Sequence, residues 1–204
     1  MTQPFNLQDY FGQIDIYLFD QLLKERFTPE TRVLDAGCGG GRNLLYLMRT
    51  GYACYGVDAS ADAVAHVRHT AAVVAPQLPA ENFRVERVEE MSFADASFDL
   101  VISSAVLHFA DDPEHFRRML AEMWRVLRPG GIFFARLASS IGIESLVVPL
   151  GNGRFRLPDG SERFLIDEQM LIDETNILGG EFLEPIKTTN VQNLRCMTTW
   201  CLRK

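Results

Sequence analysis

Short apolar runs alternate with helical patterns over the first two-thirds of the chain. Runs rich in Val, Leu, Ile and Phe are typical of strands buried on both faces, and they predict strands at residues 32–36, 53–57, 83–88, 98–103 and 132–137. Apolar residues at helical spacing predict helices at 42–50, 60–74 and 113–127. This alternation favours an α/β fold in which a parallel, doubly wound sheet carries helices on both faces.

The two ends of the chain follow other patterns. Phe11, Ile14, Leu18 and Leu22 recur at helical spacing and predict a first helix over residues 7–27. Beyond residue 138, the turn signal PDG at 158–160 predicts a hairpin over 154–164. A helix at 167–178 and two edge strands, 182–189 and 196–202, should follow. We therefore expect a single domain over residues 1–204, with a helical cap at 1–30 and a hairpin or flap insertion at 139–166 near the functional site.

The composition limits the classes of partner, the location and the kinds of site that we expect. The 204 residues are 47% apolar, enough for one core, and the formal net charge of −7 disfavours nucleic acids and anionic membranes as partners. No apolar run is long enough to span a bilayer, and residues 1–7 lack the pattern of a signal peptide, so we expect a cytoplasmic protein. Cys38, Cys54, Cys196 and Cys201 have neither zinc-site spacing nor disulfide density, which predicts reduced thiols and no metal site.

The most informative segment is a strand that runs into a glycine-rich turn and then a helix, with the sequence DAGCGGGRN at residues 35–43. Glycines allow a sharp turn and let a ligand approach the backbone closely. The dinucleotide pattern G-x-G-x-x-G fails because Arg42 occupies its third glycine position, whereas Asp35, Gly37, Gly39 and Gly41 complete the pattern D-x-G-x-G-x-G. A corner shaped only by helix packing is the alternative that the glycines alone leave open.

A carboxylate closes the next predicted strand. Asp58 follows Val57 and stands about twenty residues past the glycines, where an acidic side chain can accept hydrogen bonds from both ribose hydroxyls. A surface or helix-capping aspartate is the alternative. Together, the glycine turn and this carboxylate predict a nucleoside site at the carboxyl edge of the sheet.

With these motifs, residues 33–137 resemble the class I methyltransferases that depend on S-adenosylmethionine (SAM). The segments FDLVISSAVLHF at 98–109 and LRPGG at 127–131 carry the resemblance further. It implies a Rossmann-like sheet of seven strands in the order 3-2-1-4-5-7-6 with the last strand antiparallel. It also implies SAM as the cofactor and S-adenosylhomocysteine (SAH) as the product. The cofactor-binding residues implied by the resemblance are Asp35, Gly37, Cys38, Gly39, Arg42, Asn43, Asp58, Ala59, Val88, Glu89, Ser103 and Ser104.

The resemblance also assigns these residues to parts of SAM. Asp35 and the backbone of 37–41 face the methionine end, Asp58 holds the ribose, and Ser103 or Ser104 contacts the methionine amino group.

The resemblance also implies that the adenine of SAM lies beside Ala59 and the turn at Val88 and Glu89. There the chain departs from the family, which often has an acidic residue where this sequence has Arg87. The adenine amine is therefore left to Glu89 or to the backbone alone, and a solvated loop charge is the alternative for Glu89.

The reaction needs few catalytic groups, because SAM already carries an activated methyl. Proximity and orientation can supply roughly 7–11 kcal/mol, so a general base is optional. His108 is the one candidate for a base, since it follows the fourth strand at the ligand-binding edge. A hydrogen bond within its loop is the alternative for His108.

The acceptor is not identified by any motif. The fourth strand is not followed by the motif of nucleobase amino methyltransferases, and the acidic balance favours a small-molecule acceptor. Residues 41–43 and 195–200 are also similar to tellurite-resistance-like methyltransferases. Two rival functions stay open, a non-catalytic SAM-binding domain and an aminopropyltransferase that uses decarboxylated SAM. Nothing in the sequence predicts an oligomeric state.

Overall fold

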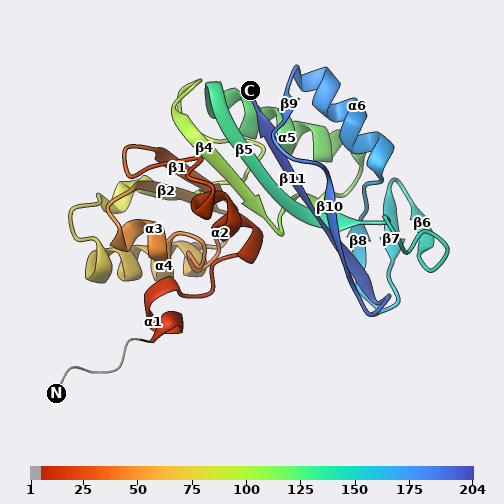
Figure 1. Cartoon of the computed structure of the whole chain (residues 1–204), viewed down its shortest axis with the longest axis horizontal. Coiled ribbons are helices and arrows are strands. Elements are labelled where there is room, and N and C mark those ends of the chain that lie inside the picture. The colour runs from red at the N-terminus through yellow and green to blue at the C-terminus, as the bar shows by residue number, and fades with distance from the viewer. Residues whose placement is uncertain (1–5) are drawn as a thin grey trace.

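A long twisted sheet runs through the molecule (Figure 1), whose computed structural model describes residues 6–204. Residues 1–5, the start of the predicted helical cap, lie outside the described residues. Five parallel strands stand in the order β3-β2-β1-β4-β5. All five predicted strands are present, although β3 ends earlier than predicted and β5 extends further at both ends. Their bounds are β1 Arg32–Ala36, β2 Ala53–Asp58, β3 Phe83–Val85, β4 Phe98–Ser104 and β5 Leu127–Ser139.

The far edge of the sheet is antiparallel, as predicted. β11 (Arg195–Arg203) runs antiparallel to β5, and β10 (Lys187–Val191) pairs with β11, so the predicted strand order is confirmed. The predicted strand at 182–189 is instead two pieces, because a short β9 (Glu181–Phe182) also pairs with β11. Pro185 lies in the break and has no N–H for a ladder. Within residues 6–204 the sheet therefore has eight strands rather than seven.

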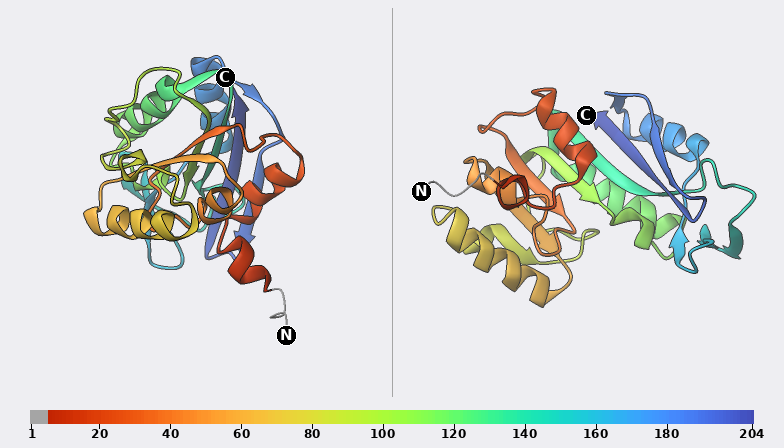
Figure 2. Two further views of the ribbon diagram at one scale, coloured as in Figure 1. Left: turned by 90° about the vertical axis from the view of Figure 1, so that its left-hand side faces the viewer. Right: turned by 60° about the horizontal axis from the view of Figure 1, so that its bottom comes forward.

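Helices cover both faces of this sheet (Figure 2). On one face lie α2 (Ile16–Leu23), α3 (Leu45–Arg49) and α4 (Ala61–Val74), and on the other lie α5 (Pro113–Val126) and α6 (Glu168–Leu178). The predicted doubly wound arrangement is confirmed. Two single 3₁₀ turns, η1 (Ala80–Asn82) and η2 (Leu107–Phe109), precede β3 and α5. No helix among residues 6–204 is long and apolar enough to cross a bilayer.

The N-terminal helix is broken, contrary to the prediction of one helix over 7–27. The structure has α1 (Leu7–Phe11) and α2, separated by Gly12 at a φ of 67°. Asp15 then caps α2, since its Oδ1 accepts from the N–H of Tyr17 at 3.0 Å. A glycine at positive φ followed by a capping aspartate ends one helix and starts another, which periodicity alone does not register.

The segment after β5 forms a small separate sheet. β6 (Val148–Gly151), β7 (Arg154–Arg156) and β8 (Glu162–Phe164) are antiparallel neighbours, so the predicted hairpin is present with one additional strand. We call residues 148–164 the flap; Figure 1 shows it at the carboxyl end of β5. It is anchored by Phe164, whose ring stacks on Phe116 of α5 at 5.2 Å between centroids.

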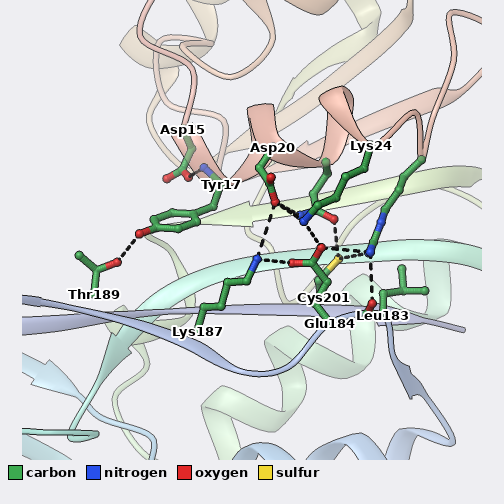
Figure 3. Close-up of polar contacts among 11 residues, drawn as sticks. Asp15, Tyr17, Asp20, Lys24, Leu183, Glu184, Lys187, Thr189 and Cys201 are labelled. Atoms are coloured by element: carbon green, nitrogen blue, oxygen red, sulfur yellow. Dashed lines mark hydrogen bonds and ion pairs between the residues drawn. The ribbon is translucent and has the colours of Figure 1, made fainter.

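Polar contacts fasten α2 to the antiparallel edge of the sheet (Figure 3). Glu184, in the break between β9 and β10, pairs with Lys24, with Arg26 at 3.0 Å and with Lys187 at 2.7 Å. Near the start of α2, the hydroxyl of Tyr17 lies 2.6 Å from that of Thr189 on β10. These contacts fix the N-terminal segment against β10 and the break that precedes it.

Replacing Glu184 by Gln should lower the free energy of unfolding at pH 7 by about 1 kcal/mol, a value discounted for solvent screening. Burial raises the pKa of Glu184, but the hydrogen bonds from Lys187 and Lys24 outweigh it and hold the pKa at about 2, below the ordinary 4.5. Because the folded pKa is depressed, the stabilisation is present above about pH 4.5 and is lost as the pH falls towards 2. Urea unfolding at pH 7 and 2.5 measures this difference. Glu181→Gln, at an exposed position of β9, is the control and should change little.

Candidate cofactor site

The glycine turn joins β1 to α3 at the carboxyl edge of the parallel strands. The N–H groups of Gly37 and Cys38 both donate to the carbonyl of Val57, at 2.8 and 2.9 Å, so the turn is held against the end of β2. A Cβ at Gly37 would meet Val106 at 2.4 Å, and one at Gly41 would meet Val67 at 2.5 Å. Gly39, in contrast, has open space on its Cβ side. Two of the three pattern glycines therefore permit close packing, while Gly39 borders open space.

Asp58 stands at the end of β2 and links the turn to the next helix. Its Oδ2 accepts from the N–H of Gly39 and its Oδ1 from the N–H of Ser60, each at 2.9 Å. A carboxylate has about four lone-pair positions. One position on each oxygen thus stays available, which matches the two hydroxyls of a ribose.

Asp35 lies beneath the turn, 1% exposed. The Asn43 side chain donates a hydrogen bond to it, but its Oδ2 has no hydrogen-bond partner among the described residues. Burial raises the pKa of Asp35 to about 7, against the opposing effects of the Arg42 charge and the Asn43 hydrogen bond. An orphaned carboxylate oxygen at this place suits a cationic or hydrogen-bonding ligand group above it.

Asp35→Asn should raise the melting temperature at pH 8 while it weakens SAM binding. The folded pKa lies above the unfolded value of 3.8, so ionising Asp35 costs folding free energy as the pH rises through 7, on the order of 2–4 kcal/mol. The gain in stability of Asp35→Asn over the parent should therefore be absent below pH 4 and largest above pH 7. Thermal unfolding from pH 4 to 8 checks the sign. A variant less stable than the parent at pH 8 would contradict it.

Arg42 ties three elements together above this buried carboxylate. Its Nη2 donates to the hydroxyl of Ser104 at the end of β4 (2.9 Å), and its Nη1 donates to the carbonyl of Gln13 before α2 (3.3 Å). The buried Asp15 pairs with Arg136 of β5 at 2.8 Å, and its N–H donates to Asn43. The N-terminal segment is thereby fixed to the strand ends that flank the glycine turn.

A cavity of about 350 Å³ opens beside the turn. Five residues that the sequence predicted as cofactor-binding line it, and the other predicted ones lie behind or beside it. The predicted lining residues are Gly37, Asp58, Ala59, Val88 and Glu89, and the lining residues without a predicted role are Arg87, Ala105, Val106, Phe109, His115 and Met119.

Glu89 is held in place at one end of this cavity. Arg87 lies 2.5 Å from its Oε1, and Nε2 of His115, buried on the first turn of α5, lies 3.4 Å from the same atom. Burial raises the pKa of Glu89, but its own backbone N–H and the Arg87 side chain outweigh it, so the net pKa is lowered. Arg87, which departs from the family pattern, thus orients the neighbouring carboxylate. His115 could have been suggested by the Asp-Pro helix start at 112–113, which places it at the sheet edge.

His108 is buried, and its Nδ1 accepts a hydrogen bond from the N–H of Ala138 at 3.1 Å. Burial, followed by the charge of Arg163, lowers the pKa of His108 to about 4. A neutral imidazole with Nδ1 occupied carries its hydrogen on Nε2 and donates there. The structure thus gives His108 a hydrogen bond to strand β5 rather than one within its own loop; a role as general base stays a prediction.

The remaining predicted residues lie in the turn itself and at the end of β4. Cys38 is buried, and burial raises the pKa of its thiol, so it is no nucleophile at neutral pH. The hydroxyl of Ser103 is buried without a partner among the described residues, and that of Ser104 is bound to Arg42.

Known proteins share this architecture. The family model of the methyltransferase domain matches residues 34–135, half of the chain, from β1 into β5. The chain belongs to the methyltransferase-domain family. SAM is the cofactor of this family, and the orphaned Asp35 oxygen, the free positions on Asp58 and the cavity all fit it.

Relatives in the family differ in length and acceptor. The chain is 33% identical over 117 residues to an uncharacterized methyltransferase of Synechocystis, covering 56% of this chain and 51% of that protein. It is 31% identical over 137 residues to the phthiotriol/phenolphthiotriol dimycocerosates methyltransferase of Mycobacterium tuberculosis, covering 65% and 47%. The chain thus spans about half the length of these relatives.

A solved structure shares the fold over almost the whole chain. The 1,6-didemethyltoxoflavin-N1-methyltransferase of Burkholderia thailandensis, with its acceptor and SAH bound, matches with a TM-score of 0.72 at 18% identity, covering 98% of this chain and 81% of that one. The predicted Rossmann-like fold is confirmed; the finer similarity to tellurite-resistance-like enzymes stays a prediction.

Proposed function

We propose that this protein transfers the methyl group of SAM to a small-molecule acceptor, and that residues 1–204 form one catalytic domain with a helical cap and an inserted flap. One observation carries the proposal: each oxygen of Asp58 accepts one backbone hydrogen bond, from Gly39 of the turn and from Ser60 before α4, and Asp58 lines the same cavity as Gly37 and Glu89. The small acceptor is supported by the acidic balance and by the names of the relatives.

The residues would act by holding and orienting. Asp58 would hold the ribose hydroxyls, Glu89 would accept from the adenine amine, and Asp35 with the backbone of 37–41 would receive the methionine end. SAM, when bound, supplies a methyl group on a positively charged sulfur. The ionised Asp35 would favour that cation, and the cavity walls would exclude water. Alignment of the acceptor is then the main task of the protein.

The cytoplasm is the location that we propose. It rests on the four cysteines, Cys38, Cys54, Cys196 and Cys201, all of which are free and buried.

Calorimetric titration with SAH followed by a transfer assay tests the proposal. Micromolar SAH binding, and transfer of labelled methyl from SAM to at least one member of a small-molecule panel, is the expected result. Binding of SAH without transfer to any of a broad acceptor set would favour the non-catalytic alternative. Release of methylthioadenosine from decarboxylated SAM with a polyamine would favour aminopropyl transfer. The absence of SAH binding at millimolar concentration would refute the cofactor site itself.

A further inference from the structure

Two arginines of the flap face η2 without a carboxylate partner. Within residues 6–204, no carboxylate oxygen lies within 4.0 Å of Arg154 or Arg163. Arg154 donates to the carbonyl of Ala110, just after η2, at 3.1 Å. Arg156, in the same small sheet, is paired with Glu162 at 2.7 Å. The uncompensated charge of the flap thus lies on its side towards η2.

Arg163 lies over the ring of Phe109, with its Cζ 5.0 Å from the ring centroid. Its one hydrogen bond within the described residues goes from Nη1 to the carbonyl of Glu162 at 2.8 Å, so most of its N–H donors are free. Asp159, whose pKa it helps to lower, is engaged mainly with Ser161 and lies 3.8 Å from Arg195. A guanidinium in this state is a ready site for an anion.

Phe109 connects this charge to the cofactor cavity. It lines the cavity together with Gly37 and Val106, yet the residue is 56% exposed. An aromatic ring at a cavity rim, with a guanidinium above it, offers both a face for a planar group and donors for a negative one. The positive charge of Arg163 also acts at the sheet edge, where it contributes to the lowered pKa of His108.

We propose that Arg163 and Phe109 form an acceptor subsite for a small aromatic molecule that carries an anionic group, a carboxylate or a phosphate. The anionic oxygens bind the Arg163 guanidinium, and the ring lies against Phe109 at the rim of the cavity. The proposal rests on the proposed methyltransferase function for its biological meaning. Arg163 lies in the flap, outside the residues 34–135 that the family model matches, whereas Phe109 lies inside them, so the subsite joins the shared domain to the segment that follows it.

Benzoate and benzamide, which have nearly the same shape and differ in charge, are the probes. Binding is measured by ligand-detected NMR on the protein saturated with SAH and on the protein without it. Benzoate should bind the parent at millimolar concentration and at least fivefold more tightly than benzamide. Arg163→Gln should weaken benzoate binding at least fivefold and remove the preference. Arg156→Gln, which changes the paired arginine of the same sheet, should leave both affinities unchanged.

Each outcome decides the proposal. Three results would overturn it: equal binding of benzoate by the parent and Arg163→Gln, no preference for benzoate over benzamide, or no benzoate binding at roughly 50 mM, well above a millimolar Kd. A circular dichroism melt verifies that Arg163→Gln is folded, and Phe109→Leu gives a second variant that should weaken benzoate binding while the charge remains. Failure of SAH binding in the parallel titration would instead refute the cofactor site, because Arg163 and Phe109 are not part of the glycine turn.

Discussion

Asp58→Asn is expected to weaken SAH binding at least tenfold while the protein stays folded. The substitution removes the charge that strengthens hydrogen bonds from the ribose hydroxyls, each worth about 1.5–3 kcal/mol. It also replaces one acceptor oxygen by an NH₂ group, which then faces the donor N–H of Gly39 or Ser60. Both the loss of the ligand contacts and the shift of the turn lower the affinity for SAH. Calorimetric titration with SAH measures the change.

The matched control is Asp62→Asn, an exposed acidic position in the first turn of α4. It removes the same charge four residues away and should leave the SAH affinity within about twofold, as expected for a screened surface charge. If the two variants bind SAH equally well, Asp58 does not hold the ribose and serves only to cap the turn.

Gly37→Ala should destabilise the protein by about 2–4 kcal/mol, through backbone strain and overpacking. The backbone φ of Gly37 is 83°, a conformation that L side chains rarely adopt, and the new Cβ would lie 2.4 Å from Cγ2 of Val106. Val106 lines the cavity, so its displacement should also lower SAH affinity. Chemical denaturation and SAH titration measure the two effects.

Two further variants separate strain from collision. Val106→Ala removes the methyl that the new Cβ would meet, so the double variant should recover part of the stability lost in Gly37→Ala. Gly39→Ala, at φ 50° with nothing within 4 Å of its Cβ, should cost only about 1 kcal/mol of stability. Because that Cβ would project into the open space at the turn, SAH binding should still weaken. Equal destabilisation by Gly37→Ala and Gly39→Ala would show that the Val106 contact does not matter.

The elements that depend on short-range pattern were predictable. Buried parallel strands produce continuous apolar runs, and β1, β2 and β4 begin and end within a residue of the prediction. The glycine turn and Asp58 were also predictable, because both lie at strand ends and only α3 and β2 separate them along the chain. The break of the first helix was not, since Gly12 and Asp15 act through backbone conformation and capping rather than periodicity.

The site was predictable where it lies on the chain's own motif. Five of the predicted residues line the cavity, and Asp35 lies behind it with a hydrogen bond from Asn43 and the charge of Arg42 nearby. The other side of the cavity comes from η2 and α5, far along the sequence. His115, Phe109 and Met119 there have no spacing that relates them to the glycines.

The sequence by itself determined the succession of strands and helices along the chain, the glycine turn and the carboxylate at the end of β2. These features follow from local sterics and from the periodicity of apolar residues, and both can be recognised in short stretches of the sequence. Tertiary structure alone decided that Arg87 and His115 meet at Glu89, that Asp35 is buried enough for its pKa to reach about 7, and that the flap places Arg163 over Phe109. Such contacts depend on how distant elements pack and on how much water they exclude, and no local pattern specifies either.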